Sequence, residues 1–164
     1  MTELVSGIAH EVIAFLRESG ASVSTAESLT GGLVCAELIG VPGASDVVRG
    51  GIVAYTVEAK RDLLGVPADL INSYGTVDAH VAASMANAAR RRFGSTYGLA
   101  TTGVAGPDPS EGKPAGTVHI AIAGPEGTTS YLLGLDGDRN TIRIRTVAEI
   151  LSRFVDRVRE ESRS

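Results

Sequence analysis

The feature that most constrains the fold of this chain is a short link between two strand-like segments near its C-terminal end. The segments cover residues 117–123 and 129–133, and the turn sequence Gly124-Pro125-Glu126-Gly127 joins them. This link is too short for the helical crossover that parallel strands need, so the two strands are expected to form an antiparallel hairpin. Upstream of the hairpin, helical and strand-like patterns alternate. The sequence therefore predicts an α/β protein with a mixed, mostly parallel sheet and helices on both faces of that sheet.

Apolar spacing and capping residues place the remaining elements. Thr56, Asp78 and Asp138 are suited to cap helices, and Gly20 is suited to end the first one. Helices are expected over residues 3–19, 31–39, 57–64, 67–75, 78–93 and from 138 onward, and strands over residues 21–26, 51–55 and 97–102. The sequence shows neither a repeat nor an interdomain linker, so residues 1–164 are expected to form one domain.

Composition and charge exclude several classes of protein. Hydrophobic residues make up 43% of the chain and the net charge is −4, a balance that disfavours binding to nucleic acid phosphates. No apolar run approaches the roughly 20 residues that cross a bilayer, so a cytoplasmic protein with no membrane partner is expected. Cys35 is the only cysteine, and the three histidines lie far apart. Neither a metal site nor a cofactor is therefore expected.

A segment rich in hydroxyls and glycines, Thr25 to Gly32, lies between an expected strand and an expected helix. Backbone amides at a helix start attract anions, and small residues let a ligand approach. The candidate ligand-binding residues here are Ser28, Thr30, Gly31 and Gly32. A helix cap followed by a tight turn explains the same residues equally well. The charge of Glu27 would repel an anion, so a structural or ligand-orienting role suits that residue better.

Two other segments with candidate binding residues follow expected strands. Thr102 and Gly103 begin a loop rich in glycine and proline, where a hydroxyl and backbone amides can polarise a ligand oxygen. An ordinary surface loop is the alternative. Arg139 stands in the first turn of the last expected helix, where a cation opposes the helix dipole. This placement indicates either a ligand anion or an ion pair with Asp136 or Asp138.

Ser45, Tyr55 and Lys60 are the candidates for nucleophilic catalysis. Tyr55 ends an expected strand and Lys60 follows about one turn into the next helix, so both can point at one site beyond the strand. Ser45 precedes that strand and joins them only if the chain folds back. A serine nucleophile needs a base, and a desolvated neutral lysine can act as that base. The commoner roles of such residues are a solvated lysine and a helix-capping serine.

Five stretches, taken in order, resemble the signature motifs of the CinA C-terminal domain family. They are TAESLTGG (25–32), GGIVAYTVEAK (50–60), TGVAGP (102–107), KPAGTV (113–118) and GDR (137–139). The resemblance spans nearly the whole chain and implies a three-layer α/β/α sandwich that is typically a homo-oligomer. Because the usual N-terminal domain of the family is missing from this sequence, the stand-alone form is expected. The implied reaction hydrolyses the carboxamide of nicotinamide mononucleotide to nicotinate mononucleotide and ammonia, in pyridine nucleotide salvage, without a metal.

The resemblance also implies roles for individual residues. The family's proposed catalytic serine, tyrosine and lysine fall on Ser45, Tyr55 and Lys60, with Lys60 drawing the proton from Ser45. The substrate-binding positions fall on Ser28, Thr30, Gly31, Gly32, Thr102, Gly103 and Arg139. One alternative is a non-catalytic nucleotide-binding protein, suggested by Val57, which stands where the family frequently has asparagine. The other alternative is an interaction protein of the competence or recombination machinery.

Overall fold

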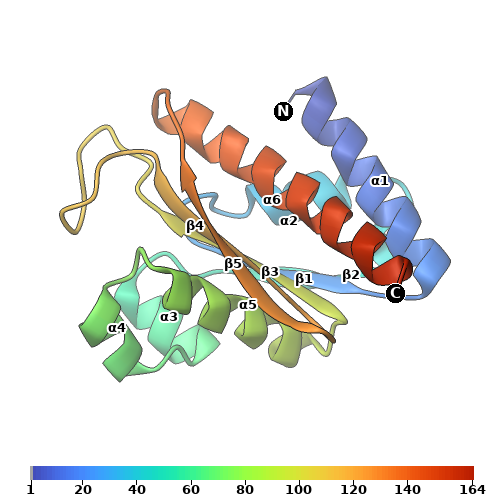
Figure 1. The fold of residues 1–164 in the computed structure, drawn as a ribbon, viewed down its shortest axis with the longest axis horizontal. Coiled ribbons are helices and arrows are strands. Elements are labelled where there is room, and N and C mark those ends of the chain that lie inside the picture. The colour runs from blue at the N-terminus through green and yellow to red at the C-terminus, as the bar shows by residue number, and fades with distance from the viewer. Residues whose placement is uncertain (1) are drawn as a thin grey trace.

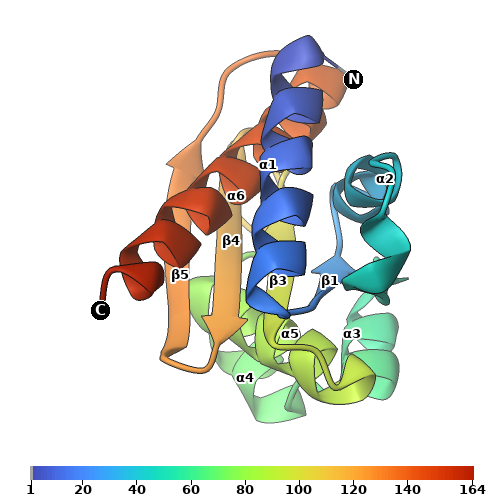
Figure 2. The same cartoon turned by 90° about the vertical axis from the view of Figure 1, so that its right-hand side faces the viewer.

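The structure is a computed structural model that describes residues 2–164. One central sheet lies between two groups of helices (Figures 1 and 2). The helices on one face are α1 (Glu3–Ser19), α2 (Leu33–Ile39) and α6 (Arg139–Ser162), and those on the other are α3 (Val57–Leu64), α4 (Ala68–Tyr74) and α5 (Ala79–Phe93). The predicted three-layer α/β/α fold is confirmed. No helix within the described residues has the length and apolar character needed to span a bilayer.

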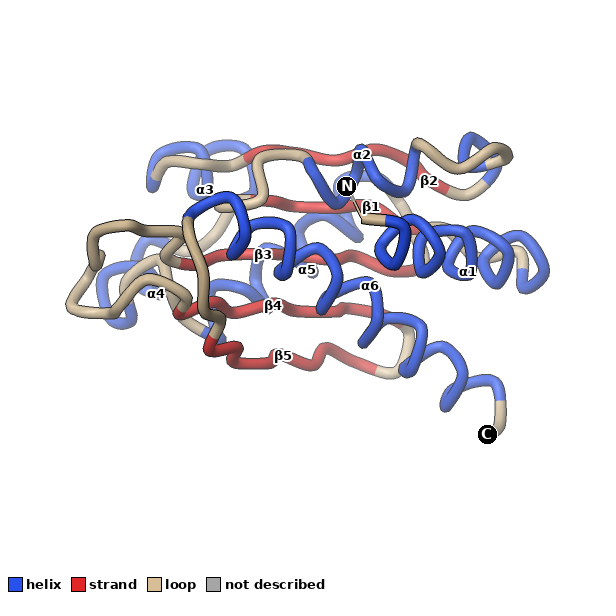
Figure 3. Tube along the Cα trace, turned by 90° about the horizontal axis from the view of Figure 1, so that it is seen from above, coloured by secondary structure: helices blue, strands red, loops and turns tan. Residues whose placement is uncertain are grey.

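The sheet has five strands in the order β2-β1-β3-β4-β5 (Figure 3). Their bounds are β1 (Val23–Glu27), β2 (Val48–Val53), β3 (Tyr97–Gly103), β4 (Thr117–Gly124) and β5 (Gly127–Gly134). Strands β2, β1 and β3 are parallel, and β4 runs antiparallel to β3. The predicted hairpin is present, with Gly124 paired to Gly127 between β4 and β5. The carboxyl ends of β1, β2 and β3 consequently meet at one edge of the sheet, where ligand sites gather in α/β folds.

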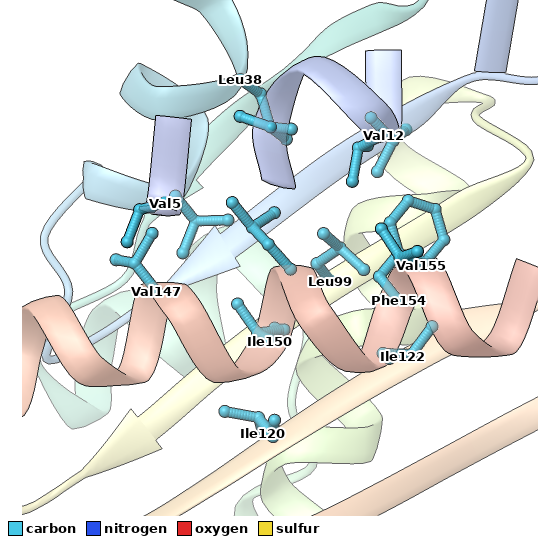
Figure 4. Packing of buried hydrophobic residues seen from close by; sticks show 14 of the residues in the cluster. Val5, Val12, Leu38, Leu99, Ile120, Ile122, Val147, Ile150, Phe154 and Val155 are labelled. Atoms are coloured by element: carbon cyan, nitrogen blue, oxygen red, sulfur yellow. The ribbon is translucent and has the colours of Figure 1, made fainter. Parts of the chain in front are cut away.

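Two hydrophobic cores fill the spaces above and below the sheet. The larger core joins α1, α2 and α6 to the sheet and includes Phe154, Ile150 and Leu99 (Figure 4). The core under α5 consists mainly of alanines, so this helix lies very close to the strands. A Cβ atom added to Gly98 of β3 would lie 2.1 Å from the carbonyl oxygen of Ala86 on α5. Large apolar side chains therefore fill the space on one face of the sheet. On the other face, α5 lies directly against the backbone of the strands.

Capping hydrogen bonds set where the helices begin. The Thr56 hydroxyl accepts a hydrogen bond from the Ala59 amide at 3.0 Å, and the Asp138 carboxylate accepts one from the Thr141 amide at 2.8 Å, as the sequence predicts. Helix α2 starts at Leu33, two residues later than expected. The reason is that Gly31 and Gly32 have φ angles of 59° and 99°, which belong to left-handed backbone and cannot continue an α-helix.

Candidate active site

A buried lysine and a serine form the centre of the candidate site. Ser28 directly follows β1, and Lys60 lies on α3, which follows β2. Because β1 and β2 are parallel neighbours, the two residues meet at the same edge of the sheet. The Lys60 Nζ atom donates a hydrogen bond to Ser28 Oγ at 2.9 Å. This pair has the geometry of a general base in contact with a serine nucleophile.

Burial controls the charge of Lys60. Its side chain is only 2% exposed, and its Nζ atom also donates to the carbonyl oxygens of Ala54 at 3.0 Å and Tyr55 at 3.3 Å. Desolvation lowers the pKa of Lys60 to about 8, against a smaller opposing effect of the Glu111 carboxylate. A lysine with such a pKa exchanges its proton near neutral pH, as a catalytic base must. Lys60 is therefore neither solvated nor a surface residue, and the sequence-based alternative of a solvated lysine is wrong.

A cavity of about 380 Å³ lies at the same edge of the sheet. Ser28 and Lys60 are buried behind it and do not line it, but Leu29, the chain neighbour of Ser28, and Tyr55, whose carbonyl oxygen Lys60 contacts, do. The walls of the cavity come from Leu29, Tyr55, Arg139 and the loop that follows β3. Arg139 donates one hydrogen bond to the carbonyl oxygen of Gly106 at 2.6 Å and another to the hydroxyl of Tyr55 at 3.1 Å. The Tyr55 hydroxyl accepts this bond, so its own hydrogen is free to point at a ligand. The cavity thus presents a phenol and a guanidinium at the edge of the sheet where Ser28 and Lys60 meet.

The segment after β1 is organised by the buried carboxylate of Glu27. That carboxylate accepts hydrogen bonds from the amides of Val34 at 2.8 Å and Cys35 at 3.0 Å, at the start of α2. It also accepts one from the hydroxyl of Thr30 at 2.6 Å. The chain therefore supplies its own anion to these amides, which confirms the structural role expected for Glu27. Thr30 is fully buried, its hydroxyl contacts Glu27 and Thr101, and it does not line the cavity.

The other predicted binding residues divide between scaffold and cavity. Gly31 and Gly32 form the left-handed turn before α2 and do not line the cavity. Thr102 is 1% exposed and donates its hydroxyl hydrogen to the carbonyl oxygen of Thr76 at 2.7 Å, so it ties β3 to another loop. Gly103 does line the cavity, as Arg139 does.

The structure separates Ser45 from the other two predicted catalytic residues. Ser45 is exposed in a short 3₁₀ turn, Ala44–Asp46, that precedes β2, and it lines a different surface depression. Lys60 follows β2, and the six residues of this strand span roughly 20 Å. The two ends of one strand lie at opposite edges of a sheet. Within one chain, Ser45 is therefore not the serine that Lys60 contacts, and this position belongs to Ser28.

Ser28, which the sequence places among the substrate-binding residues, is the serine in contact with Lys60. No motif in the sequence marks Glu111, whose carboxylate acts on the pKa of Lys60. The parallel pairing of β1 and β2 is the signal that identifies Ser28, because it brings residues after both strands together. Val57, the position that suggested a non-catalytic protein, is the first residue of α3 and does not line the cavity. No group of three or more metal-ligating side chains gathers within residues 2–164.

Together, the fold and site define a three-layer α/β protein with a buried serine–lysine pair beyond the carboxyl ends of its parallel strands. Residues 5–158 match the model of the CinA C-terminal domain. The chain belongs to this family.

Similar proteins share the family and the fold. A CinA-like protein of Frankia casuarinae is 50% identical over 140 residues, which cover 85% of this chain and 32% of that protein. A CinA-like protein of Anaeromyxobacter is 44% identical, with 86% and 35% covered. The chain thus spans about a third of the length of these curated relatives. The crystal structure of the competence/damage inducible protein CihA from Agrobacterium tumefaciens is 36% identical, with a TM-score of 0.91 and coverage of 95% and 96% of the two chains.

Proposed function

We propose that this chain is a serine–lysine amidohydrolase that converts nicotinamide mononucleotide to nicotinate mononucleotide and ammonia. The observation that carries the proposal is the 2.9 Å hydrogen bond between Lys60 Nζ and Ser28 Oγ, in a position where burial favours the neutral amine. Among amides, we choose this substrate because the resemblance of the sequence motifs to the CinA C-terminal domain family implies it. The cavity suits it because it offers a cation, Arg139, to the phosphate of a mononucleotide.

The reaction proceeds through four proton transfers at Lys60, two in acylation and two in deacylation. The neutral amine of Lys60 takes the proton of Ser28, and the serine oxygen bonds to the carboxamide carbon, whose C=O electrons move to its oxygen. When the carbonyl re-forms, the C–N bond breaks, and the ammonium of Lys60 returns its proton to the departing NH₂ group, which leaves as ammonia. Water, deprotonated by Lys60, then attacks the resulting ester. The ester C–O bond then breaks, and the ammonium of Lys60 returns its proton to the Ser28 oxygen, which releases the acid product and restores the hydroxyl.

Tyr55 and Arg139 orient the substrate in this scheme. The Tyr55 hydroxyl accepts a hydrogen bond from Arg139, so its own hydrogen is free for a ligand in the cavity. Arg139 donates two hydrogen bonds, to Gly106 and Tyr55, and a guanidinium has five N–H donors. Donors therefore remain for an anionic ligand.

The test is ammonia release from nicotinamide mononucleotide by the purified protein, with a matched pair of serine variants. Ser28→Ala is expected to lower kcat at least roughly 1,000-fold, because it removes the nucleophile. Ser45→Ala is expected to leave kcat within about twofold, since it lies at the other edge of the sheet. Mass spectrometry of acid-quenched enzyme should show an acyl adduct on the peptide that contains Ser28. Full activity in Ser28→Ala would refute the mechanism.

A second measurement separates catalysis from binding alone. Nicotinamide mononucleotide should raise the Tm of both the wild-type protein and Ser28→Ala, because the variant keeps the cavity. If the wild-type protein is stabilised by the ligand but releases no ammonia, the chain is a nucleotide-binding protein and the proposed activity is wrong.

A further inference from the structure

The loop between β3 and β4 is fastened to the turn between α4 and α5 by one carboxylate. Glu111 accepts hydrogen bonds from the Thr76 hydroxyl at 2.6 Å, from the Thr76 amide at 3.0 Å and from the Val77 amide at 3.1 Å. Lys113, from the same loop, donates to the carbonyl oxygen of Val77. A loop held by this many bonds to charged groups has a defined position relative to the helices beneath it.

The attachment of Glu111 requires unusual backbone conformations on both sides. Glu111 has a φ angle of 54° and is the only residue other than glycine with a positive φ within residues 2–164. On the opposite side, a Cβ atom on Gly75 would lie 2.6 Å from a carboxylate oxygen of Glu111. A non-glycine residue in the left-handed region costs roughly 1–3 kcal/mol and persists only where surrounding contacts enforce it. The bonds to Thr76 and Val77 are those contacts.

The fastened loop is also a wall of the candidate active site. Residues 103–108 and Ser110 line the cavity together with Tyr55. In Figure 1 this loop is the yellow segment that extends beyond the strand ends. The Thr102 hydroxyl, at the end of β3, donates to the carbonyl oxygen of the same Thr76. The turn at residues 75–78 therefore holds the β3–β4 loop at two points: at the end of β3, through Thr102, and within the loop, through Glu111.

Glu111 is also the charged side chain that acts on Lys60. Its carboxylate raises the pKa of Lys60 and thereby opposes the larger effect of burial. The Glu27 carboxylate, on β1, is occupied by the amides at the start of α2. Arg139 on α6 is directed to Gly106 and Tyr55.

The other charged groups on the elements around Lys60 are exposed or are paired with other residues. On α3 itself, Glu58 is exposed and Arg61 pairs with Asp62. At the turn before α5, Asp78 pairs with His80. On the β3–β4 loop, Lys113 lies 4.0 Å from Glu111, and Asp108 is exposed at the cavity wall. On β4, His119 has its pKa lowered by burial, which favours the uncharged ring.

We propose that Glu111 is a positioning residue for the candidate active site: its carboxylate holds the β3–β4 loop, which lines the cavity, against the turn before α5, and its negative charge acts on the Lys60 amine. The kinetic part of this inference rests on the proposed amidohydrolase function. The charge has a purpose in that reaction, since Lys60 must first accept a proton and then return it to the leaving amine. A base that performs both steps works best when its two protonation states are both accessible near the working pH.

The chain allows a direct test, because Lys60 and Lys113 are its only lysines. In protein labelled with ¹³C and ¹⁵N at lysine, NMR titration follows two side-chain amines, and Lys113→Arg assigns them. Glu111→Gln removes the charge and keeps a hydrogen-bond acceptor. It is expected to lower the pKa of Lys60, because a nearby negative charge favours the charged form of the amine. The exposed control Glu58→Gln, on the same helix as Lys60, should leave that pKa unchanged.

Thr76→Val separates the attachment from the charge. This variant removes the hydroxyl donor to Glu111 but keeps the carboxylate. The pKa of Lys60 should therefore stay unchanged, while the KM for nicotinamide mononucleotide rises roughly three- to tenfold. In Glu111→Gln, the acidic limb of the kcat/KM profile should move to lower pH together with the NMR titration. Equal titrations of Lys60 in the wild-type protein, Glu111→Gln and Glu58→Gln would overturn the inference. A wild-type protein that releases no ammonia would instead refute the proposed function and leave the NMR result valid.

Discussion

Replacing Lys60 with methionine should make the folded protein more stable while abolishing turnover. The side chain of Lys60 is 2% exposed, and its amine contacts Ser28 and the carbonyl oxygens of Ala54 and Tyr55. Methionine has a similar length and fills the same space without a charge. The variant therefore removes the cost of burying an amine, and it also removes the hydrogen bonds that this amine donates.

The size of the effect follows from the pKa of Lys60. Burial lowers that pKa from 10.5 to about 8, and a difference of this size corresponds to about 3 kcal/mol of destabilisation of the charged form. Below pH 8 both the folded and the unfolded protein carry the proton, so the folded state bears the full cost. Between pH 8 and 10.5 the unfolded state binds more protons than the folded state, and wild-type stability rises with pH. Above pH 10.5 the amine is neutral in both states and the cost is gone.

Loss of the hydrogen bonds opposes this gain by about 2 kcal/mol, which is the net worth of two to three such bonds. We expect Lys60→Met to be about 1 kcal/mol more stable than the wild-type protein at pH 7 and about 2 kcal/mol less stable at pH 10.5. Urea unfolding of both proteins at a series of pH values measures the difference. Arg61→Met, on the exposed side of the same helix, is the control and should give a difference that does not depend on pH. A Lys60→Met difference that is constant from pH 7 to 10.5 would show that the amine is not desolvated.

Four further predictions concern activity and packing. The kcat/KM of the wild-type protein should rise roughly tenfold from pH 7 to 9 as Lys60, with its pKa of about 8, loses its proton; a flat profile would remove Lys60 as the base. Glu27→Gln should lower the free energy of unfolding by about 1–3 kcal/mol in urea, because the amides of Val34 and Cys35 lose a charged acceptor. Gly98→Ala should destabilise by about 3 kcal/mol, since its Cβ would meet Ala86; an unchanged Tm would contradict the close approach of α5 to β3. Tyr55→Phe should lower kcat while leaving stability within about 0.5 kcal/mol, because the side chain is 60% exposed.

Most of the fold could be predicted because its signals are local. The Gly124–Gly127 link, the capping residues Thr56 and Asp138, and the apolar spacing of α1 and α6 each act within a few residues. The order of the strands is not local, because β1 lies between β2 and β3 only through contacts between residues distant in the chain. The start of α2 was misplaced because the sequence shows glycines at 31 and 32 but not the sign of their φ angles.

The candidate site could be predicted only in part, because some of its signals are local and others depend on contacts between distant residues. Lys60 stands out as one of two lysines in a chain rich in arginine, and Tyr55 marks the end of a strand. The partner of Lys60 depends on which strands are neighbours, and the family resemblance places the catalytic serine at Ser45 whereas the structure puts Ser28 in contact with Lys60. Thr30 and Thr102 look like ligand-binding hydroxyls in the sequence, yet both satisfy buried groups of the scaffold. Hydroxyl direction is decided by tertiary packing, which the residue type does not reveal.

The exposed phenol of Tyr55 offers a built-in optical reporter. The chain contains four tyrosines and no tryptophan, so its ultraviolet emission comes from tyrosine alone. Tyr55 lines the cavity, whereas Tyr97 is buried and bonded to Glu161. In a variant in which Tyr74, Tyr97 and Tyr131 are replaced by phenylalanine, Tyr55 at the cavity would therefore be the only tyrosine that fluoresces. Occupancy of the cavity could then be followed in real time with unlabelled protein, even in variants that cannot turn over.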